Sequence, residues 1–246
     1  MVSPREPLRV DVALCERGLF ESRAKAREAI LAGLVEVDGR RIAKPSQLVA
    51  PDAEIVAQAL YPYVSRGGVK LAHALEAFGV DAKDRHCLDV GASTGGFTDA
   101  LLRSGARHVV AVDVGHDQLH EKLRRDARVT SLEGLDARAL TTEHLTEAPS
   151  LIVVDASFIS LALVLPSALG LAASGAELVA LVKPQFEAGR KAGKKGVVRD
   201  EAVHAQVCAR VSAEVEALSW RVLGLIASPI EGGDGNREFL LHARRM

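Results

Sequence analysis

Cysteine and aromatic residues are scarce in this chain, and each shortage excludes a class of protein. The three cysteines, Cys15, Cys87 and Cys208, are an odd and widely spaced set without a C-x-x-C pair. The sequence therefore predicts no disulfide-stabilised scaffold, no zinc site and no required metal, and it favours a reducing, cytoplasmic location. Aromatic residues make up only 4% of the chain, so aliphatic side chains and alanine must build the core.

An excess of charge of one sign is also missing, since 31 basic and 32 acidic residues leave a net charge of −1. Any nucleic-acid-binding surface must therefore be a local basic patch. Residues 1–11 lack the apolar run of a signal peptide. The apolar stretch 160–182 is long enough to span a bilayer, but Pro166, Gly170 and Glu177 interrupt it. We expect a helix, a Ser-Gly turn and a strand there, and no membrane partner.

The chain is organised around residues 86–97, HCLDVGASTGGF, which we interpret as a buried strand, a glycine turn and the start of a helix. In open α/β sheets, ligands bind outside the carboxyl ends of such strands. The spacing lacks the G-x-G-x-x-G pattern that seats a dinucleotide pyrophosphate. A second apolar strand, 108–114, carries Asp113 near its end, where an acid suits the hydroxyls of an adenosine ribose. Together these features favour S-adenosylmethionine over a plain tight turn, and Asp136 is placed to reach an adenine amino group.

Residues 1–60 have a pattern of their own. We predict helices over 8–17 and 23–32, a strand at 34–37, a hairpin turn at Asp38-Gly39, a returning strand at 40–42 and a further strand at 54–56. This arrangement is similar to the alpha-L RNA-binding module of a small-subunit ribosomal protein and of many pseudouridine synthases. Its basic residues gather at 23–27 and 40–44, where they could clamp a phosphate backbone. A solvated helix face is the alternative.

Polar residues at the ends of apolar elements mark the second domain, 64–246, which follows a linker at 61–63. Asp155 and Lys183 end two predicted buried strands, and Glu238 starts the last strand. Lys70 opens a helix, where the helix dipole disfavours a cation, although an ordinary surface lysine is the alternative. Two lysines and two carboxylates on one rim would be hard to explain as packing, because buried charges need partners.

These four residues resemble the Lys-Asp-Lys-Glu tetrad of the FtsJ-like ribose 2′-O-methyltransferases, and nearly the whole chain resembles the TlyA family. The motifs that carry this resemblance most specifically are DVGASTGGFT at 89–98, KPQFEAGR at 183–190, GVVRD at 196–200 and DGNREF at 234–239. The resemblance implies a Rossmann-like class I methyltransferase fold, α/β with a mostly parallel seven-stranded sheet and an antiparallel last strand. A small N-terminal α+β RNA-binding domain precedes it.

The resemblance also implies an activity, the transfer of a methyl group from S-adenosylmethionine to the ribose 2′-hydroxyl of cytidine in ribosomal RNA. Lys183 would orient and deprotonate that hydroxyl, Lys70 and Glu238 would position the groups, and Asp155 would lie between cofactor and lysines. The expected cofactor contacts are Asp89, Gly91, Ala92, Ser93, Gly95, Gly96, Phe97, Asp113, Asp136 and Asp155. The expected RNA contacts are Arg9, Arg23, Lys44, Arg66 and Phe158, the last by stacking on a base, with core packing as the alternative for that aromatic side chain.

Two other functions compete with this interpretation. One is a membrane-active haemolysin, a name attached to the same family, which the lack of a signal peptide and of a lytic amphipathic helix disfavours. The other is an RNA-binding ribosome-assembly factor with a silent methyltransferase fold, which the complete tetrad disfavours. The basic loop 187–200 suits a polyanion, or it is simply solvated.

Overall fold

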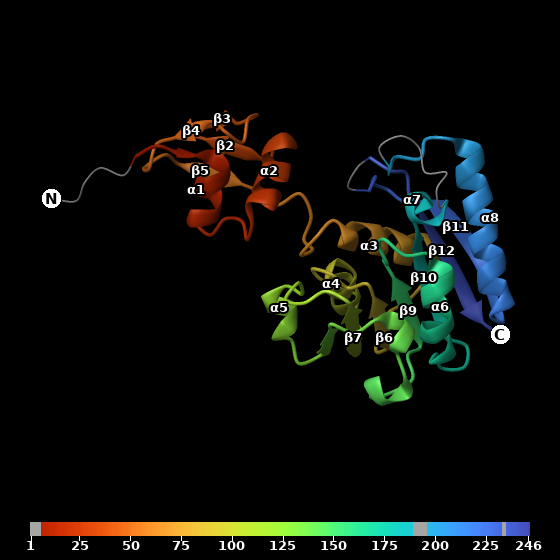
Figure 1. The fold of residues 1–246 in the computed structure, drawn as a ribbon. Helices are drawn as coiled ribbons and strands as arrows, with labels where there is room; N and C mark the ends of the chain where they lie inside the picture. Colours follow the sequence, from red (N-terminus) through yellow and green to blue (C-terminus); the bar gives the residue numbers. More distant parts are fainter. Residues whose placement is uncertain (1–5, 189–195, 233–234) are drawn as a thin grey trace. The chain divides into compact units, whose positions relative to one another are not determined.

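The computed structural model describes residues 6–188, 196–232 and 235–246. Two compact units divide the chain, residues 1–62 and residues 63–246. Both are drawn in Figure 1, and each is described by itself. Within the described ranges, no helix combines the length and the apolar character needed to cross a membrane.

The first unit packs two short helices, α1 (Val10–Glu16) and α2 (Arg23–Leu31), with short antiparallel strands. Strand β2 (Val35–Val37) pairs with β3 (Arg40–Arg41) and with β5 (Ile55–Ala57), while β1 (Leu8–Arg9) pairs with β4 (Leu48–Val49). Helix α2 begins at Arg23 as predicted, and Ser22 caps it, because its side chain accepts a hydrogen bond from the Lys25 amide at 3.3 Å. The core of this unit is aliphatic apart from Phe20, and it includes Val10, Leu14, Ile30, Val35 and Ile42.

The second unit is built on a seven-stranded sheet with the order β11-β12-β10-β9-β6-β7-β8. Its strands are β6 (His86–Val90), β7 (His108–Asp113), β8 (Val129–Glu133), β9 (Leu151–Val154), β10 (Glu177–Val182), β11 (Trp220–Ala227) and β12 (Phe239–Arg245). Strand β12 runs antiparallel to both of its neighbours, and the pairs among β10, β9, β6, β7 and β8 are parallel. The predicted fold class is confirmed.

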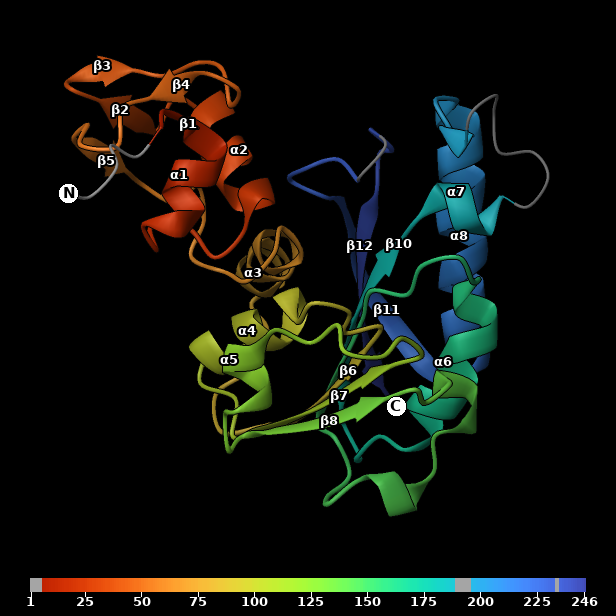
Figure 2. The same cartoon turned by 60° about the vertical axis from the view of Figure 1, so that its left-hand side comes forward.

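Helices cover both faces of this sheet (Figure 2). One face carries α3 (Gly67–Phe78), α4 (Gly96–Arg103) and α5 (Glu121–Arg124), and the other carries α6 (Leu161–Gly170) and α8 (Glu201–Ala217). The strands supply both cores by alternation, since Leu88 and Val90 face one layer and Cys87 faces the other. The remaining short elements are α7 (Pro184–Glu187) and the single turns η1 (Ala137–Ala139) and η2 (Thr142–His144).

Several predicted boundaries differ from the structure. The first predicted helix begins at Val10 instead of Leu8, because Leu8 and Arg9 pair with β4, a strand that the sequence did not reveal. The stretch 116–125 is helical only over α5, because the Glu133 carboxylate accepts hydrogen bonds from the Gln118 and Leu119 amides and holds those residues in a loop. The stretch 160–182 does form a helix, a turn and a strand, as expected.

Candidate active site

Strand register brings three of the four tetrad positions to one rim of the sheet. Asp155 follows β9 and Lys183 follows β10, and these two strands are parallel neighbours. Glu238 precedes β12, whose first residue, Phe239, pairs with Val182 in an antiparallel register. The start of the reversed strand therefore lies at the carboxyl ends of the parallel strands.

Lys70 completes the group from α3. Its ammonium nitrogen lies 2.5 Å from Glu238 Oε2, and the whole Lys70 residue is only 8% exposed. The alternative of an ordinary surface lysine is therefore wrong. Glu238 is 3% exposed, and its other oxygen accepts a long hydrogen bond of 3.4 Å from the Gln185 amide. Because an unpaired buried charge is costly, each member of this pair depends on the other.

Lys183 forms the second pair of the tetrad. Its ammonium nitrogen lies 2.6 Å from Asp155 Oδ1 in an ion pair. The same nitrogen donates to Ser157 Oγ at 2.7 Å and lies 5.9 Å from the centre of the Phe186 ring. Ser157 was not among the predicted site residues, and its place two positions after a tetrad acid is the signal that could have found it.

The electrostatics of Asp155 connect the two pairs. Burial raises the pKa of its carboxyl group, while the nearby positive charges of Lys183 and Lys70 oppose that rise and the Glu238 carboxylate adds to it. Lys183, Lys70 and Glu238 therefore all influence the pKa of Asp155, so the four tetrad residues form one electrostatic group.

A cavity of about 580 Å³ opens beside this group. Asp155 and Ser157 are part of its wall, together with Gly91, Asp113 and Asp136 from the neighbouring elements. Ser93 and Phe158 also line it, as do several residues that the sequence did not single out: Val114, Gly115, Gln118, Arg138 and Ile159. Five predicted cofactor contacts, Asp89, Ala92, Gly95, Gly96 and Phe97, do not line the cavity.

The five residues outside the cavity wall belong to the end of β6, the turn after it and the start of α4. Asp89 is fully buried, accepts a hydrogen bond of 2.6 Å from Thr98 Oγ1, and has its pKa raised to about 7, chiefly by burial. Gly96 lies under the start of α3, because a Cβ atom there would come within 2.2 Å of Ser65 Oγ. Gly91 has φ +83°, and a Cβ atom at that position would lie 2.8 Å from the Asp155 carbonyl oxygen.

Two acids at the far side of the cavity are held by local donors. Asp113 accepts hydrogen bonds from the Ser93 amide at 2.8 Å and the Gly115 amide at 2.7 Å. Asp136 pairs with Arg138, whose side-chain hydrogen bonds lower the pKa of the Asp136 carboxyl to about 2. Both carboxyl groups are therefore held in fixed positions at the cavity wall.

Phe158 is placed as an exposed aromatic side chain instead of a core residue. Its residue exposure is 90%, its φ is +64°, and its ring centre lies 4.9 Å from that of Phe186. The core-packing alternative is therefore wrong.

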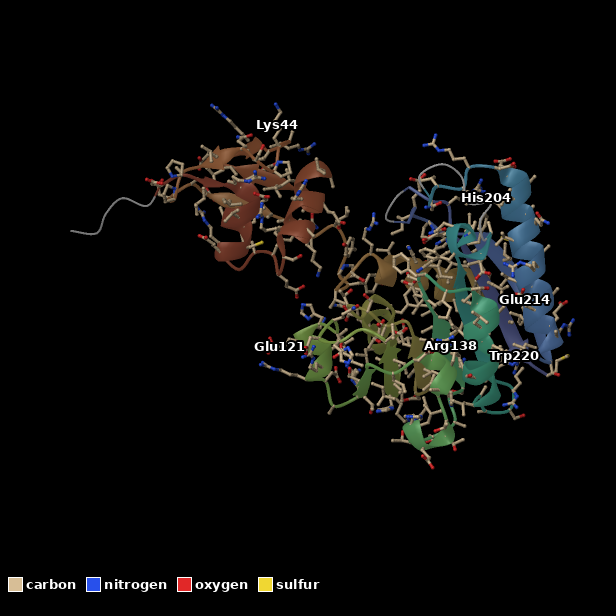
Figure 3. All side chains as sticks on the ribbon, viewed as in Figure 1. Lys44, Glu121, Arg138, His204, Glu214 and Trp220 are labelled. Atoms are coloured by element: carbon tan, nitrogen blue, oxygen red, sulfur yellow. The ribbon has the colours of Figure 1, made fainter. Side chains whose placement is uncertain are left out.

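Basic residues of the first unit surround a buried carboxylate. Asp11 is 0% exposed and lies 3.0 Å from both Arg9 Nε and an Arg23 guanidinium nitrogen. The Arg9 and Arg23 side chains stay 43% and 57% exposed. Lys44, labelled in Figure 3, is also exposed. Arg66 belongs to the second unit and immediately precedes α3.

Two further expectations concern the basic loop at 187–200 and the lack of a required metal. Most of the predicted polyanion-binding loop, including Arg190, Lys191, Lys194 and Lys195, lies outside the described residues. Among the residues that the structure does describe, no group of three or more histidine, cysteine, aspartate or glutamate side chains could hold a metal ion.

Comparison with known proteins agrees with this geometry. Residues 63–245 match the FtsJ-like methyltransferase family and residues 8–55 match the S4 domain. The chain is 48% identical to YqxC of Bacillus subtilis over 98% of its length and 86% of that protein. It is 47% identical to the 16S/23S rRNA (cytidine-2′-O)-methyltransferase TlyA of Mycobacterium tuberculosis, over 96% of this chain and 89% of that protein.

A solved structure from Streptococcus thermophilus that carries the name hemolysin is similar in fold. It matches with a TM-score of 0.78 and 43% identity, covering 100% of this chain and 90% of that one. Fold and matched domains thus define an FtsJ-like methyltransferase joined to an S4 domain. Within that class, the chain belongs to the TlyA family of hemolysin-like rRNA methyltransferases.

Proposed function

We propose that this protein uses S-adenosylmethionine to methylate the ribose 2′-hydroxyl of cytidine in ribosomal RNA. The observation that carries the proposal is the shared wall between cavity and tetrad. Asp155 and Ser157 line the cavity, and both contact the ammonium group of Lys183. A methyl donor bound in the cavity would thus lie beside the group that handles the acceptor hydroxyl.

The cavity fits an adenosine-containing sulfonium compound in three respects. Asp113 and Asp136 offer carboxylates for ribose hydroxyls and an adenine amino group, and Gly91 leaves the backbone open where a side chain would collide with Asp155. Among the described residues, the wall holds three carboxylates, Asp113, Asp136 and Asp155, against one basic side chain, Arg138, which suits a positively charged ligand without phosphates. S-adenosylmethionine, when bound, supplies the methyl group.

The protein's part in the reaction is placement and proton transfer. Lys183 orients the ribose hydroxyl and takes its proton at Nζ, once that nitrogen is in the neutral form. Asp155 and Ser157 hold Nζ at the cavity wall, and the Lys70–Glu238 pair fixes the adjoining rim. General acid–base catalysis by one such group typically contributes about 10²–10⁴-fold to the rate.

We assign RNA binding to residues 1–60, a linker to 61–63 and catalysis to 64–246. Arg9, Arg23 and Lys44 would bind phosphates, Arg66 would contact the RNA near the linker, and Phe158 would stack on a base. The S4 match and the relatives' names support ribosomal RNA as the partner. Such a substrate places the protein in the cytoplasm with the ribosomal subunits.

The test is methyl transfer from labelled S-adenosylmethionine to separated ribosomal subunits from a strain that lacks the modification. Label should appear on a ribose of at least one subunit and be lost with Lys183→Ala. Lys83→Ala is the matched control, because Lys83 is exposed before β6, at the opposite end of the sheet. A protein that binds RNA but labels neither subunit would instead be an assembly factor.

A further inference from the structure

The segment 155–161 runs from the residue after β9 to the first residue of α6. It carries three residues of the proposed site: Asp155, Ser157 and Phe158. It is a connection without regular secondary structure over most of its length. Side chains from α7 and the residue before it contact both of its ends. At one end, Lys183 lies against Asp155 and Ser157.

The other end is held by Glu187, the last residue of α7. One carboxylate oxygen accepts a hydrogen bond of 2.7 Å from the Leu161 amide, and the other accepts one of 2.7 Å from Ser160 Oγ. Between the two ends, Phe186 contacts Phe158 with ring centres 4.9 Å apart. Lys183 and the four-residue helix α7 that follows it therefore clamp the segment at its start, middle and end.

Glu187 is buried without taking part in the tetrad. Its side chain is 2% exposed, and its charge is balanced by Arg210 of α8, which lies 2.7 Å from Oε2 and also donates to the Glu187 carbonyl at 3.0 Å. A buried carboxylate is costly unless donors surround it, and the donors here are the Ser160 hydroxyl, the Leu161 amide and the Arg210 guanidinium.

Phe158 is the residue most dependent on this clamp. Its φ of +64° is rare for a bulky side chain and persists only where the surroundings fix it. Its side chain cannot supply much of that support, because the residue is 90% exposed. Glu187 accepts hydrogen bonds from Ser160 and Leu161, two and three positions later in the chain, and these anchor the part of the segment that follows Phe158.

We propose that Glu187 is a positioning residue, which holds Phe158 in its exposed conformation for contact with the substrate nucleotide. This inference deepens the proposed function and rests on it. The backbone amide of Glu187 donates to the Lys183 carbonyl at 3.2 Å, but its carboxylate contacts Ser160, Leu161 and Arg210 and does not line the cavity. A change of the carboxylate alone therefore acts on the reaction through the segment 155–161. Removing its charge should therefore weaken RNA recognition chiefly through Phe158.

The test is steady-state methyl transfer to ribosomal subunits by Glu187→Gln, alone and combined with Phe158→Leu. We expect Glu187→Gln to raise the KM for subunits about ten-fold with a much smaller change in kcat, as for lost uniform binding. In the Phe158→Leu background the same change should alter the KM less than about two-fold, because interacting positions are not additive.

Glu214→Gln is the matched control. It removes the other carboxylate that pairs with Arg210, at 2.5 Å and one helical turn along α8, without touching the segment. It should leave the KM unchanged. If Glu187→Gln does not fold, Arg210→Gln tests the same clamp from the exposed side, because the Arg210 side chain is 40% exposed.

The possible outcomes distinguish a failure of the positioning role from a failure of the proposed function. An unchanged KM in Glu187→Gln, or an equal loss with and without Phe158, overturns the positioning role and leaves the proposed function intact, since the wild type still methylates. A wild-type protein that transfers no methyl group overturns the proposed function and this inference with it.

Discussion

Both units bury one aspartate completely, yet the two carboxyl groups have opposite pKa shifts. Asp11 and Asp89 are each 0% exposed. Hydrogen bonds from Arg9 and Arg23 lower the pKa of Asp11 to about 2 despite its burial. Asp89 has only the Thr98 hydroxyl as a side-chain donor, and burial raises its pKa to about 7. The exposure of an acid alone therefore does not decide its charge, because its charged partners and its depth in the structure both contribute.

The two units also differ in how exposed the positively charged partners of their carboxylates are. In the first unit the carboxylate is buried and its cations are exposed, so Asp11 fixes two arginines that can meet phosphates. In the second unit the cations are buried as well, since Lys70 and Lys183 are 8% and 7% exposed. Exposed cations suit electrostatic binding, and buried lysines suit proton transfer.

The largest expected effect comes from breaking a pair whose cation is buried. Lys70→Met should destabilise the second unit by about 3–5 kcal/mol, because it leaves Glu238 buried and unpaired. The double variant Lys70→Met with Glu238→Gln should regain most of that stability but no methyl transfer. Urea unfolding followed by the fluorescence of Trp220, the one tryptophan, reports the second unit, where it is 1% exposed. A double variant as unstable as the single one would contradict this account.

The next largest expected effect is that Asp89 makes the stability of the second unit depend on pH. Asp89 ionises near 3.8 when unfolded and at about 7 when folded, so in that window the folded state binds more protons. Its contribution to stability is therefore full below pH 3.8 and is lost as pH rises towards 7, at up to about 1.4 kcal/mol per pH unit.

Asp89→Asn tests this sign, because asparagine can still accept the Thr98 hydrogen bond without ionising. Relative to the wild type, the variant should gain stability steadily between pH 4 and pH 7 in urea unfolding. Thr98→Val is a useful companion, since it removes the donor and leaves the acid. Stability curves of wild type and Asp89→Asn that stay parallel across this range would refute the assigned shift.

The strand ends that carry Asp113, Asp155 and Lys183 could be predicted from the sequence. Runs of buried apolar residues define parallel strands, and a polar residue at the end of such a run is a visible break in composition. The location of the cavity followed from the same pattern, because open α/β sheets bind ligands at those ends. The motif at 89–98 was harder to interpret residue by residue, since Gly91 and Ser93 line the cavity whereas Asp89 and Gly96 do not.

Other features depend on tertiary structure and leave no local signal. Lys70 and Glu238 are 168 positions apart, and only the reversal of β12 brings them together. Strands β1 and β4 have two residues each, too few for a periodic pattern. The clamp by Glu187 was missed because an acid after an apolar strand and a proline looks like an ordinary surface residue until its burial is known.

A smaller effect is expected from Asp11→Asn, which keeps both exposed arginines but frees their side chains. Immobilising a long side chain on binding costs about 0.5–1.5 kcal/mol, so two arginines should weaken rRNA binding by about 1–3 kcal/mol. The number of phosphate contacts stays the same, so the dependence of affinity on salt should not change. Filter binding of an rRNA fragment at several salt concentrations measures both quantities, and a reduced salt slope would contradict pre-organisation as the role of Asp11.

The smallest effect is expected from Lys44→Ala, which removes one exposed lysine, whereas Asp11→Asn removes the carboxylate that holds two exposed arginines. The slope of log affinity against log salt should fall by about 1, the change expected for one lost phosphate contact. Glu54→Gln, an exposed change in the same unit, controls for a general shift in charge. At saturating rRNA the rate of methyl transfer should equal that of the wild type, because Lys44 belongs to the other unit. An unchanged salt slope would remove Lys44 from the RNA surface and leave the arginines held by Asp11 as its phosphate contacts.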